Sequence, residues 1–591
     1  MTEDNRNLLL AFTLSMLVLF GWFYFVDRPR MEADRARIET QTEPAKPAPG
    51  PGGNPAASDI PRPDGAPGGR LPGSESVMAG TRSRGEILAQ SPRIPIDNGQ
   101  VHGSISLTGG RLDDLTLIGY RETVSPASPE IVLLSPAGSS KPYYAEYGFV
   151  AVGAAPPRLP DYQTRWTGDV NQVLRPGNPV TLSWDNGEGL RFTRTYAVDD
   201  HFLFTLTDRV ENTGGSTVSL MPYGLVSRHY TPEVAGYFIL HEGLLGVLNG
   251  TLNEITYEDI REEAQERVQS TGGWLGLTDK YWLVTLIPDQ NAAFTGSFSY
   301  RTLGGHDRYQ ADYLREAISL APGESREVTS RLFAGAKKVE VIDAYASQYA
   351  ITLFDRAIDW GWFYFLTKPL FTVIEWFYGL TGNFGVAIIL LTLAVKAAFF
   401  PLANTSYVAM SKMKKVQPMM MEIREKFADD KMRQQQEMME LYRREKVNPI
   451  SGCLPMLVQI PVFFALYKVL FVTIEMRHAP FFGWIHDLAA PDPTSIFNLF
   501  GLLPWTPPGF LMIGIWPILM GVSMWMQQKL NPPPADPVQE KIFLWMPVFF
   551  TFLLGTFPAG LVIYWTVNNV LSIIQQAVIM KREGAEVSFR L

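Results

Sequence analysis

A single basic residue, Lys396, lies inside an apolar stretch that is long enough to cross a lipid bilayer. The stretch runs from Phe384 to Leu402 and reads FGVAIILLTLAVKAAFFPL, close to the ~20 apolar residues that a spanning helix needs. Thr392 lies one turn before Lys396, on the same helical face. An ammonium at membrane depth costs about 2.5–3.5 kcal/mol on insertion scales. Lys396 therefore requires a polar or hydrated neighbourhood, where it would attract an acidic or polar segment of a ligand.

Other polar side chains recur in the apolar segments that follow. They are Gln459, Ser523, Gln527, Thr551, Tyr564, Asn568 and Asn569. A packed bundle needs few such groups, so we expect them to converge on a hydrated groove that reaches partway into the membrane. Two plainer interpretations stay open. Lys396 would snorkel toward the cytoplasmic end of its helix, about 10 Å away by helical rise, and Gln459 and Asn568 would form ordinary hydrogen bonds between helices.

The composition and the motifs exclude several kinds of catalytic site. One cysteine, Cys453, among 591 residues rules out an internal disulfide framework and a cysteine-based zinc site. His241 and Glu242 begin the tract HEGLL, which lacks the second histidine of a zinc-protease motif. The chain has no phosphate-binding loop, and its net charge of -8 gives no support for nucleic-acid binding. We therefore predict that the protein is not an enzyme and needs no cofactor or metal.

Six apolar segments predict six membrane spans. The first, Leu8 to Val26, is long, ends in aromatic residues and lacks a cleavage pattern, which favours an uncleaved anchor. The other five belong to the C-terminal part of the chain, at about 384–403, 453–474, 509–528, 542–557 and 560–580. The stretch from Trp360 to Tyr378 is aromatic and amphipathic and is interrupted at Pro369. It predicts a helix that lies along the membrane surface, with a spanning helix as the alternative.

The chain between the first two spans is polar and rich in turn signals. Residues 40–80 are rich in Pro, Gly, Ala and Ser, which predicts a disordered tether. From about residue 85 to 335, short β-branched and aromatic runs alternate with turns such as Asp97-Asn98-Gly99, which favours a large antiparallel sandwich. The predicted fold class is a multi-domain membrane protein with a helical transmembrane bundle and an antiparallel β-sandwich. Its predicted domains are an anchor (1–27), a tether (28–84), the β-sandwich (85–337), a linker with the interfacial helix (338–380) and a five-span core (381–591).

A charged stretch at 406–446 gives the strongest orientation signal. It predicts two antiparallel helices joined at Ala428-Asp429-Asp430. Its basic residues slightly outnumber its acidic ones, which places this hairpin and both termini in the cytoplasm and the β-sandwich outside. The basic residues that we expect to recruit a partner are Lys412, Lys414, Lys415, Arg424, Arg443 and Arg444. A methionine stripe offers a soft surface for apolar partners or simply packs the two helices together; it comprises Met410, Met413, Met420, Met421, Met438 and Met439.

Several tracts resemble a known family. The tract KVNPISGCLPMLVQIPVFFALY after the charged hairpin, the stretch APFFGWIHDLAAPDP and the ending FPAGLVIYWTVNNVLSIIQQ resemble the YidC/Oxa/Alb family of membrane protein insertases. TGGWLGLTDKYW in the β-rich part extends the resemblance to nearly the whole chain, and such a domain is typical of Gram-negative members. The resemblance implies a location in the cell inner membrane. It also implies a five-helix insertase core with a groove open to the cytoplasm and to lipid, and a periplasmic β-supersandwich without enzymatic activity.

The resemblance also assigns residues to the groove. The family's basic groove residue is usually arginine; the matching position here is Lys396, with Thr392 as its partner. Lysine keeps the charge and lacks the planar two-pronged donor of arginine. The expected groove residues are Lys396, Thr392, Gln459, Ser523, Gln527, Tyr564, Asn568 and Asn569. Trp565 stands where a second tyrosine is often seen, and about Ser495 to Pro508 is extra sequence of unknown role.

The function that the resemblance implies is the insertion and folding of nascent integral membrane proteins. The implied partners are ribosome–nascent chain complexes, the Sec translocon with its accessory subunits and the lipid bilayer. A first alternative is a secondary transporter that uses Lys396 and the glutamines for a small solute, although no internal repeat is seen. A second alternative is a membrane-tethered β domain that binds or hydrolyses sugars through scattered carboxylates.

Overall fold

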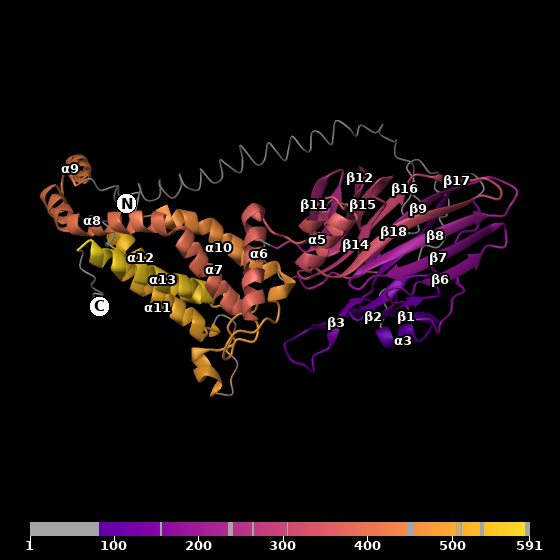
Figure 1. Cartoon of the computed structure of the whole chain (residues 1–591), viewed down its shortest axis with the longest axis horizontal. Helices are drawn as coiled ribbons and strands as arrows, with labels where there is room; N and C mark the ends of the chain where they lie inside the picture. Colours follow the sequence, from indigo (N-terminus) through magenta and orange to yellow (C-terminus); the bar gives the residue numbers. More distant parts are fainter. Residues whose placement is uncertain are drawn as a thin grey trace. The chain divides into compact units, whose positions relative to one another are not determined.

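The computed structural model describes residues 82–153, 156–234, 240–262, 265–303, 305–445, 454–503, 505, 507–508, 511–531 and 537–584. A β-rich region comes first along this part of the chain, and a helical region follows it (Figure 1). The predicted anchor at 1–27 and nearly all of the tether at 28–84 lie outside the described residues.

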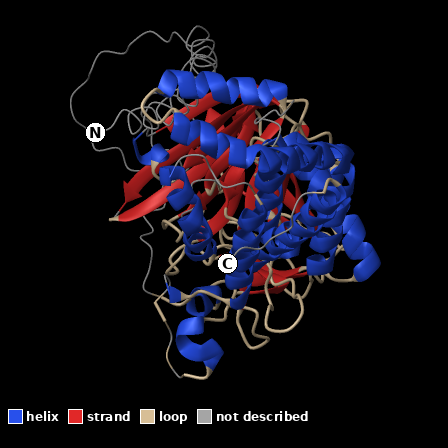
Figure 2. Ribbon diagram, turned by 90° about the vertical axis from the view of Figure 1, so that its left-hand side faces the viewer, coloured by secondary structure: helices blue, strands red, loops and turns tan. Residues whose placement is uncertain are grey.

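Two antiparallel sheets form the β-rich region, as the sequence predicts; Figure 2 shows their strands in red. The first sheet contains, in spatial order, β1 (Arg93–Asp97), β2 (Val101–Ser106), β3 (Leu112–Arg121), β5 (Tyr143–Val152), β9 (Val218–Arg228), β16 (His306–Arg315), β15 (Ala293–Leu303) and β12 (Gln265–Thr271), with β4 (Glu130–Leu134) beside β3 and β17 (Ile318–Leu320) beside β9. The second contains β11 (Thr251–Thr256), β10 (Gly243–Leu248), β13 (Gly273–Thr278), β14 (Trp282–Ile287), β18 (Ser325–Ala336), β8 (Leu203–Asn212), β7 (Leu190–Val198) and β6 (Val180–Asp185). Two short helices, α3 (Arg84–Leu88) and α4 (Asp259–Glu262), complete the region.

Alternating side chains explain why these strands form two layers. In β7, every second residue from Leu190 to Val198 is buried, as expected for a strand with one face on a core. One of these buried residues is Arg194, which donates to Asp208 of β8 and, with Nη2 at 2.8 Å, to the carbonyl of Tyr147 in the other sheet. A buried charge is tolerated when it is paired and hydrogen-bonded. Arg194 thus ties the two sheets together.

Helices make up the C-terminal region. They are α5 (Val339–Gln348), η2 (Phe354–Ala357), α6 (Tyr364–Thr381), α7 (Phe384–Ala398), α8 (Phe400–Lys426), α9 (Lys431–Arg444), α10 (Leu454–Val472), η4 (Ile474–Met476), η5 (Ile496–Gly501), α11 (Ile515–Leu530), α12 (Pro537–Leu554) and α13 (Ala559–Arg582). α11 packs against both α12 and α13, and the three helices run side by side (Figure 1). α13 also contacts α7, α8 and α10, so it is the element that the other helices share.

Several helix boundaries differ from the sequence prediction, among them the start of α12 at Pro537 instead of about 542. α7 ends at Ala398 instead of about 403, and α8 begins at Phe400, because Pro401 stands at the first turn of the new helix, where proline is favoured. α6 continues through Pro369 instead of being interrupted there. α11 begins at Ile515 instead of about 509. The predicted hairpin is otherwise present: α8 and α9 flank the Ala428-Asp429-Asp430 turn, and Asp430 caps α9 by accepting from the Arg433 amide.

The length and hydropathy of the described helices identify few obvious spans. α13 by itself is long and apolar enough to cross a membrane, and α7 with α8 qualifies only as a pair bent by 68°. The apolar parts of α10 and α12, Gln459–Val472 and Lys541–Leu554, are shorter. The count of six spans therefore stays a prediction.

The loop after α10 links the helices to one another and to the sandwich. Carbonyls of Leu488 and Ala490 accept from the amides of Gly560 and Ala559 at the start of α13, at 3.0 and 2.7 Å. Glu475 accepts from the amide of Val339 over 3.0 Å. This loop therefore lies at the end of the helical region that adjoins the β-rich region.

Candidate functional site

α13 carries a row of buried polar side chains, which we name the α13 polar stripe. Its members are Asn568, Asn569, Ser572 and Gln576, each at most 5% exposed. Asn568, Ser572 and Gln576 follow one another at intervals of four residues, which places them on one face of a helix. Because α13 contacts α7, α8, α10 and α11, this face is where polar groups from several helices meet.

Lys396 meets this stripe at Ser572. The Lys396 ammonium on α7 donates to the Ser572 hydroxyl over 2.7 Å, and that hydroxyl donates in turn to the Asn568 carbonyl over 2.7 Å. The Tyr407 hydroxyl of α8 is hydrogen-bonded to the same serine. Among the described residues, no carboxylate pairs with the ammonium. Lys396 is half-buried, and its ammonium is bonded to α13.

Thr392, which the family resemblance gives as the partner of Lys396, directs its hydrogen bond elsewhere. Its hydroxyl is buried and donates to the Ile388 carbonyl of its own helix over 2.7 Å. A threonine inside a helix commonly satisfies its hydroxyl in this way. Thr392 and Lys396 therefore share a helical face, but the Thr392 hydroxyl forms its hydrogen bond with Ile388.

The remaining expected groove residues form two further contacts along α13. Tyr564 is hydrogen-bonded to Gln459 of α10. Asn569 donates to the Ser523 hydroxyl of α11 over 3.1 Å. These are hydrogen bonds between helices, as the plainer interpretation of Gln459 expected. Gln527 lies half-buried one turn after Ser523, and Thr551 donates to the Pro547 carbonyl within its own helix over 2.8 Å.

Buried amide atoms near the last turns of α11 and α13 indicate a hydrated region. Gln528 Nε2, Gln575 Nε2 and Gln576 Oε1 are buried and have no hydrogen-bond partner among the residues that the structure describes. Buried polar atoms in native proteins nearly always bond to protein or to water. We therefore expect water molecules to bond these amides at the C-terminal end of the α13 polar stripe, beside the hairpin. Sequence reasoning missed Ser572 and Gln576, which the four-residue spacing from Asn568 could have revealed.

The basic residues of the hairpin divide into exposed and engaged groups. Lys412, Lys415, Arg443 and Arg444 are exposed, and Arg444 is also paired with Glu445 over 3.2 Å. Lys415 donates to the carbonyl of Glu583, directly after α13, over 2.6 Å. Lys414 and Arg424 are half-buried.

The methionine stripe of the hairpin divides in the same way. Met421 and Met439 are exposed. Met420 is half-buried, and its sulfur accepts from the Tyr442 hydroxyl at 4.0 Å. Packing between the two helices thus accounts for Met420 and leaves Met421 and Met439 available to a partner.

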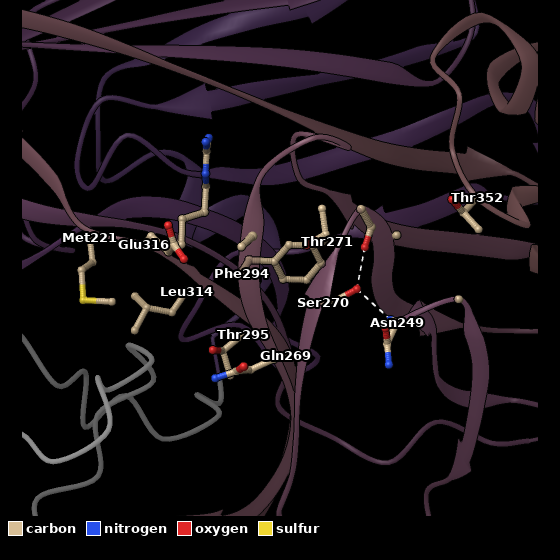
Figure 3. Close-up of a pocket in the computed structure, with 15 residues that line it drawn as sticks. Met221, Asn249, Gln269, Ser270, Thr271, Phe294, Thr295, Leu314, Glu316 and Thr352 are labelled. Carbon is tan, nitrogen blue, oxygen red and sulfur yellow. Dashed lines mark hydrogen bonds between the residues drawn. The ribbon is translucent and has the colours of Figure 1, made fainter. Parts of the chain in front are cut away.

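The β-rich region contains a cavity of about 490 Å³ between the β10–β11 turn and the ends of β12, β15 and β16 (Figure 3). The Ser270 hydroxyl accepts from the Asn249 amide and donates to the Gly272 carbonyl, each over 2.7 Å, so it holds a turn together. Among the described lining residues, Glu316 is the one carboxylate. Glycoside hydrolysis ordinarily needs a pair of carboxylates. The cavity therefore gives no support to the hydrolytic alternative.

Comparison with known proteins decides the family. A model of the YidC periplasmic domain matches residues 93–373, and one of the 60Kd inner membrane protein matches residues 376–586. The membrane protein insertase YidC of Methylobacterium radiotolerans is 54% identical over 99% of this chain and 96% of its own length. The insertases YidC of Bradyrhizobium diazoefficiens and Brucella suis are 51% and 53% identical over 99% of this chain and 98% and 97% of their own lengths.

This chain belongs to the YidC family of membrane protein insertases. The resemblance seen in the sequence is thereby confirmed, with the β-sandwich as the family's periplasmic domain. The matches give no support to the transporter alternative.

Two solved structures show weaker similarity. A crystal structure of an active YidC insertase is 17% identical, with a TM-score of 0.35, and the match covers 83% of this chain and 94% of that one. A galactose mutarotase related enzyme from Lactobacillus acidophilus is 10% identical, with a TM-score of 0.31, over 41% of this chain and 97% of its own.

Proposed function

We propose that this protein inserts nascent integral membrane proteins into the inner membrane by drawing their hydrophilic flanks toward Lys396. One observation carries the proposal: the ammonium is half-buried in the helical region and held by a serine hydroxyl, with no carboxylate partner among the described residues. A charge that is desolvated but unpaired has most to gain from a polar or acidic ligand. The α13 polar stripe extends the site, so that a substrate entering beside Lys396 finds amides and hydroxyls along one face of the helix.

Lipid partitioning supplies the driving force for the apolar part of a substrate. α10 exposes Ile460 and Phe464, and α12 exposes Trp545, Phe549 and Phe552. Along these surfaces, an apolar segment of the substrate would move from the protein into the lipid without contacting water. Transfer of apolar area from water is favourable by about 25 cal/mol per Å². The protein therefore needs no resident cofactor and no nucleotide of its own.

The location and partners follow from the proposed route. Six spans would place both termini and the α8–α9 hairpin in the cytoplasm and the sandwich in the periplasm. The exposed Lys412, Arg443 and Arg444 suit the hairpin to ribosome–nascent chain complexes, whose surfaces are anionic. Cooperation with the Sec translocon and its accessory subunits would extend the route to larger substrates.

The test replaces Lys396 in cells depleted of the native protein. Lys396→Met keeps an unbranched side chain of nearly the same length and removes its charge, so we expect insertion of small, short-tailed membrane proteins to fall severalfold. Lys396→Arg keeps the charge and should restore most insertion. Protease accessibility of a radiolabelled substrate measures the outcome, with the level of each variant checked by immunoblotting. Full insertion by the methionine variant, or unimpaired insertion after depletion, would contradict the proposal.

A further inference from the structure

The segment before α11 is apolar although it lies in a loop. No charged residue occurs from Pro493 to Gln528, a range that includes both this loop and most of α11. Among the residues of 496–505 whose burial the structure describes, the side chains that are more than a third exposed are large and apolar: Ile496, Phe497, Leu499, Phe500, Leu502, Leu503 and Trp505. Leu502 is 82% exposed. We name these seven residues the loop tip. Large apolar patches on a surface mark a site that another phase or molecule covers.

Hydrogen bonds within the loop tip satisfy part of its backbone. The Phe500 amide donates to the Ser495 carbonyl over 2.8 Å, and the Leu503 amide to the Asn498 carbonyl over 3.0 Å. Leu499 and Phe500 both adopt left-handed conformations, with φ of 50° and 58°, which bulky residues seldom do. The segment thus combines internal hydrogen bonds with exposed apolar side chains. This combination suits lipid, where no water satisfies a free amide or carbonyl.

Asp492 fixes the loop tip to the first turn of α11. It is 2% exposed, and its two oxygens accept from the Trp516 amide, the Thr494 amide and hydroxyl, and the Trp484 indole, at 2.7 to 3.1 Å. Thr494 in turn accepts from the Ile515 amide over 3.0 Å. The loop tip is therefore held at a fixed place beside the helix.

That place is the end of the helical region that adjoins the β-rich region, which is the outer end in the orientation proposed above. Carbonyls of the same loop accept from the amides that begin α13, whereas the other end of α13 meets Lys415 of the hairpin. α11 has 16 residues, about 24 Å by helical rise, against ~30 Å of bilayer hydrocarbon. The apolar loop tip at this end of α11 would therefore add to the length of apolar surface that can contact the hydrocarbon of the bilayer.

We propose that the loop tip inserts into the outer leaflet of the bilayer and anchors the outer end of α11 there. Lipid fits better than a protein partner because the tip offers no charged residue to a polar rim, which protein interfaces normally have. Tryptophan is enriched at the membrane interface, and Trp505 lies in the tip. The surface also continues along the chain into the exposed Leu519 and Val522 of α11.

Spin-label accessibility tests this anchor in the full-length protein reconstituted in liposomes. A nitroxide is attached to Leu502→Cys in a Cys453→Ser background, and its collision rates with oxygen and with a neutral nickel chelate are compared. Leu519→Cys on the exposed face of α11 is the lipid control. Ser125→Cys, in the exposed β3–β4 connection, is the water control. We expect the label at 502 to favour oxygen, as at 519, and the label at 125 to favour nickel.

Three results would overturn the proposal. Preference for nickel at 502 would place the tip in water, and low collision with both reagents would mean that protein covers it. A second variant adds Leu502→Asp to Leu503→Cys; the charge should shift the label at 503 toward nickel while a label at 519 stays unchanged, which shows that the chain is still folded. An unchanged label at 503 would also count against the anchor.

Discussion

Ser572 decides where the Lys396 ammonium lies. It accepts from Lys396 at 2.7 Å and is also bonded to Tyr407, so one small hydroxyl holds two helices to α13. Ser572→Ala removes a hydrogen bond to a charged group, a class of interaction that contributes about 1.5–3 kcal/mol. We expect the ammonium to lose its fixed position and insertion to fall severalfold, with less loss than for Lys396→Met. Ser572→Thr keeps the hydroxyl and should restore insertion. Wild-type insertion rates for the alanine variant would show that the serine only packs the helices.

Glu475 should make the junction between helices and sandwich sensitive to pH. Burial raises its pKa to about 7; the Val339 amide donates to it and opposes the shift, as does the charge of Lys338, while Glu375 adds to it. An acid whose folded pKa is raised favours folding when it is protonated. Its destabilising effect is absent below about pH 4.5, its unfolded value, and complete above about pH 7.

Glu475→Gln therefore should raise the Tm at pH 8 and leave it unchanged near pH 4.5. Glutamine has almost the same shape and carries no charge at either pH. Thermal unfolding of the purified full-length protein across this range measures the difference. Glu122→Gln, in the exposed β3–β4 connection, serves as the control and should give no such trend. A Tm gain that is the same at both pH values would contradict the assignment.

At the scale of elements, Arg194 holds the two sheets of the sandwich together. It is 1% exposed and bonds both Asp208 and the Tyr147 carbonyl. Arg194→Ala leaves Asp208 without its buried partner, a change that costs about 3–5 kcal/mol. Pulse proteolysis of the β-rich region in urea measures this loss in the full chain. Arg191→Ala is the matched control on β7, because Arg191 is exposed and 3.7 Å from Asp185; such pairs contribute about 0–1 kcal/mol. Equal losses for both variants would refute the role of Arg194.

At the scale of the whole molecule, six spans require the sandwich and the hairpin to face opposite sides of the membrane. Single cysteines at Ser125 and Lys412, each exposed, test this in a Cys453→Ser background. We expect an impermeant maleimide to label position 125 in spheroplasts and to label 412 only after the membrane is permeabilised. Labelling of 412 in sealed spheroplasts would show that the number of spans or the orientation is wrong.

Local chemistry explains which predictions the structure reproduces. Short β-branched and aromatic runs predicted the antiparallel sandwich, and the alternating burial of β7 agrees with it. Asp430 caps α9 where the hairpin turn was expected. The predictions that failed concerned helix boundaries near proline and the hydrogen-bond partner of Thr392. Pro401 starts a helix and so shortens α7, and Pro369 sits within α6. The family resemblance gave Thr392 as the partner of Lys396, whereas the Thr392 hydroxyl bonds within its own helix.

The sequence by itself determined the family, the β-sandwich followed by apolar helices, and the presence of one lysine in an apolar helix, because these follow from composition, periodicity and motif. Tertiary structure alone decided which group receives that lysine. Ser572 lies 176 residues further along the chain, and only the packing of α7 and α8 against α13 brings it within hydrogen-bonding distance. It also decided that the apolar side chains of the loop tip are exposed, because only the packing of the chain determines which apolar residues are covered.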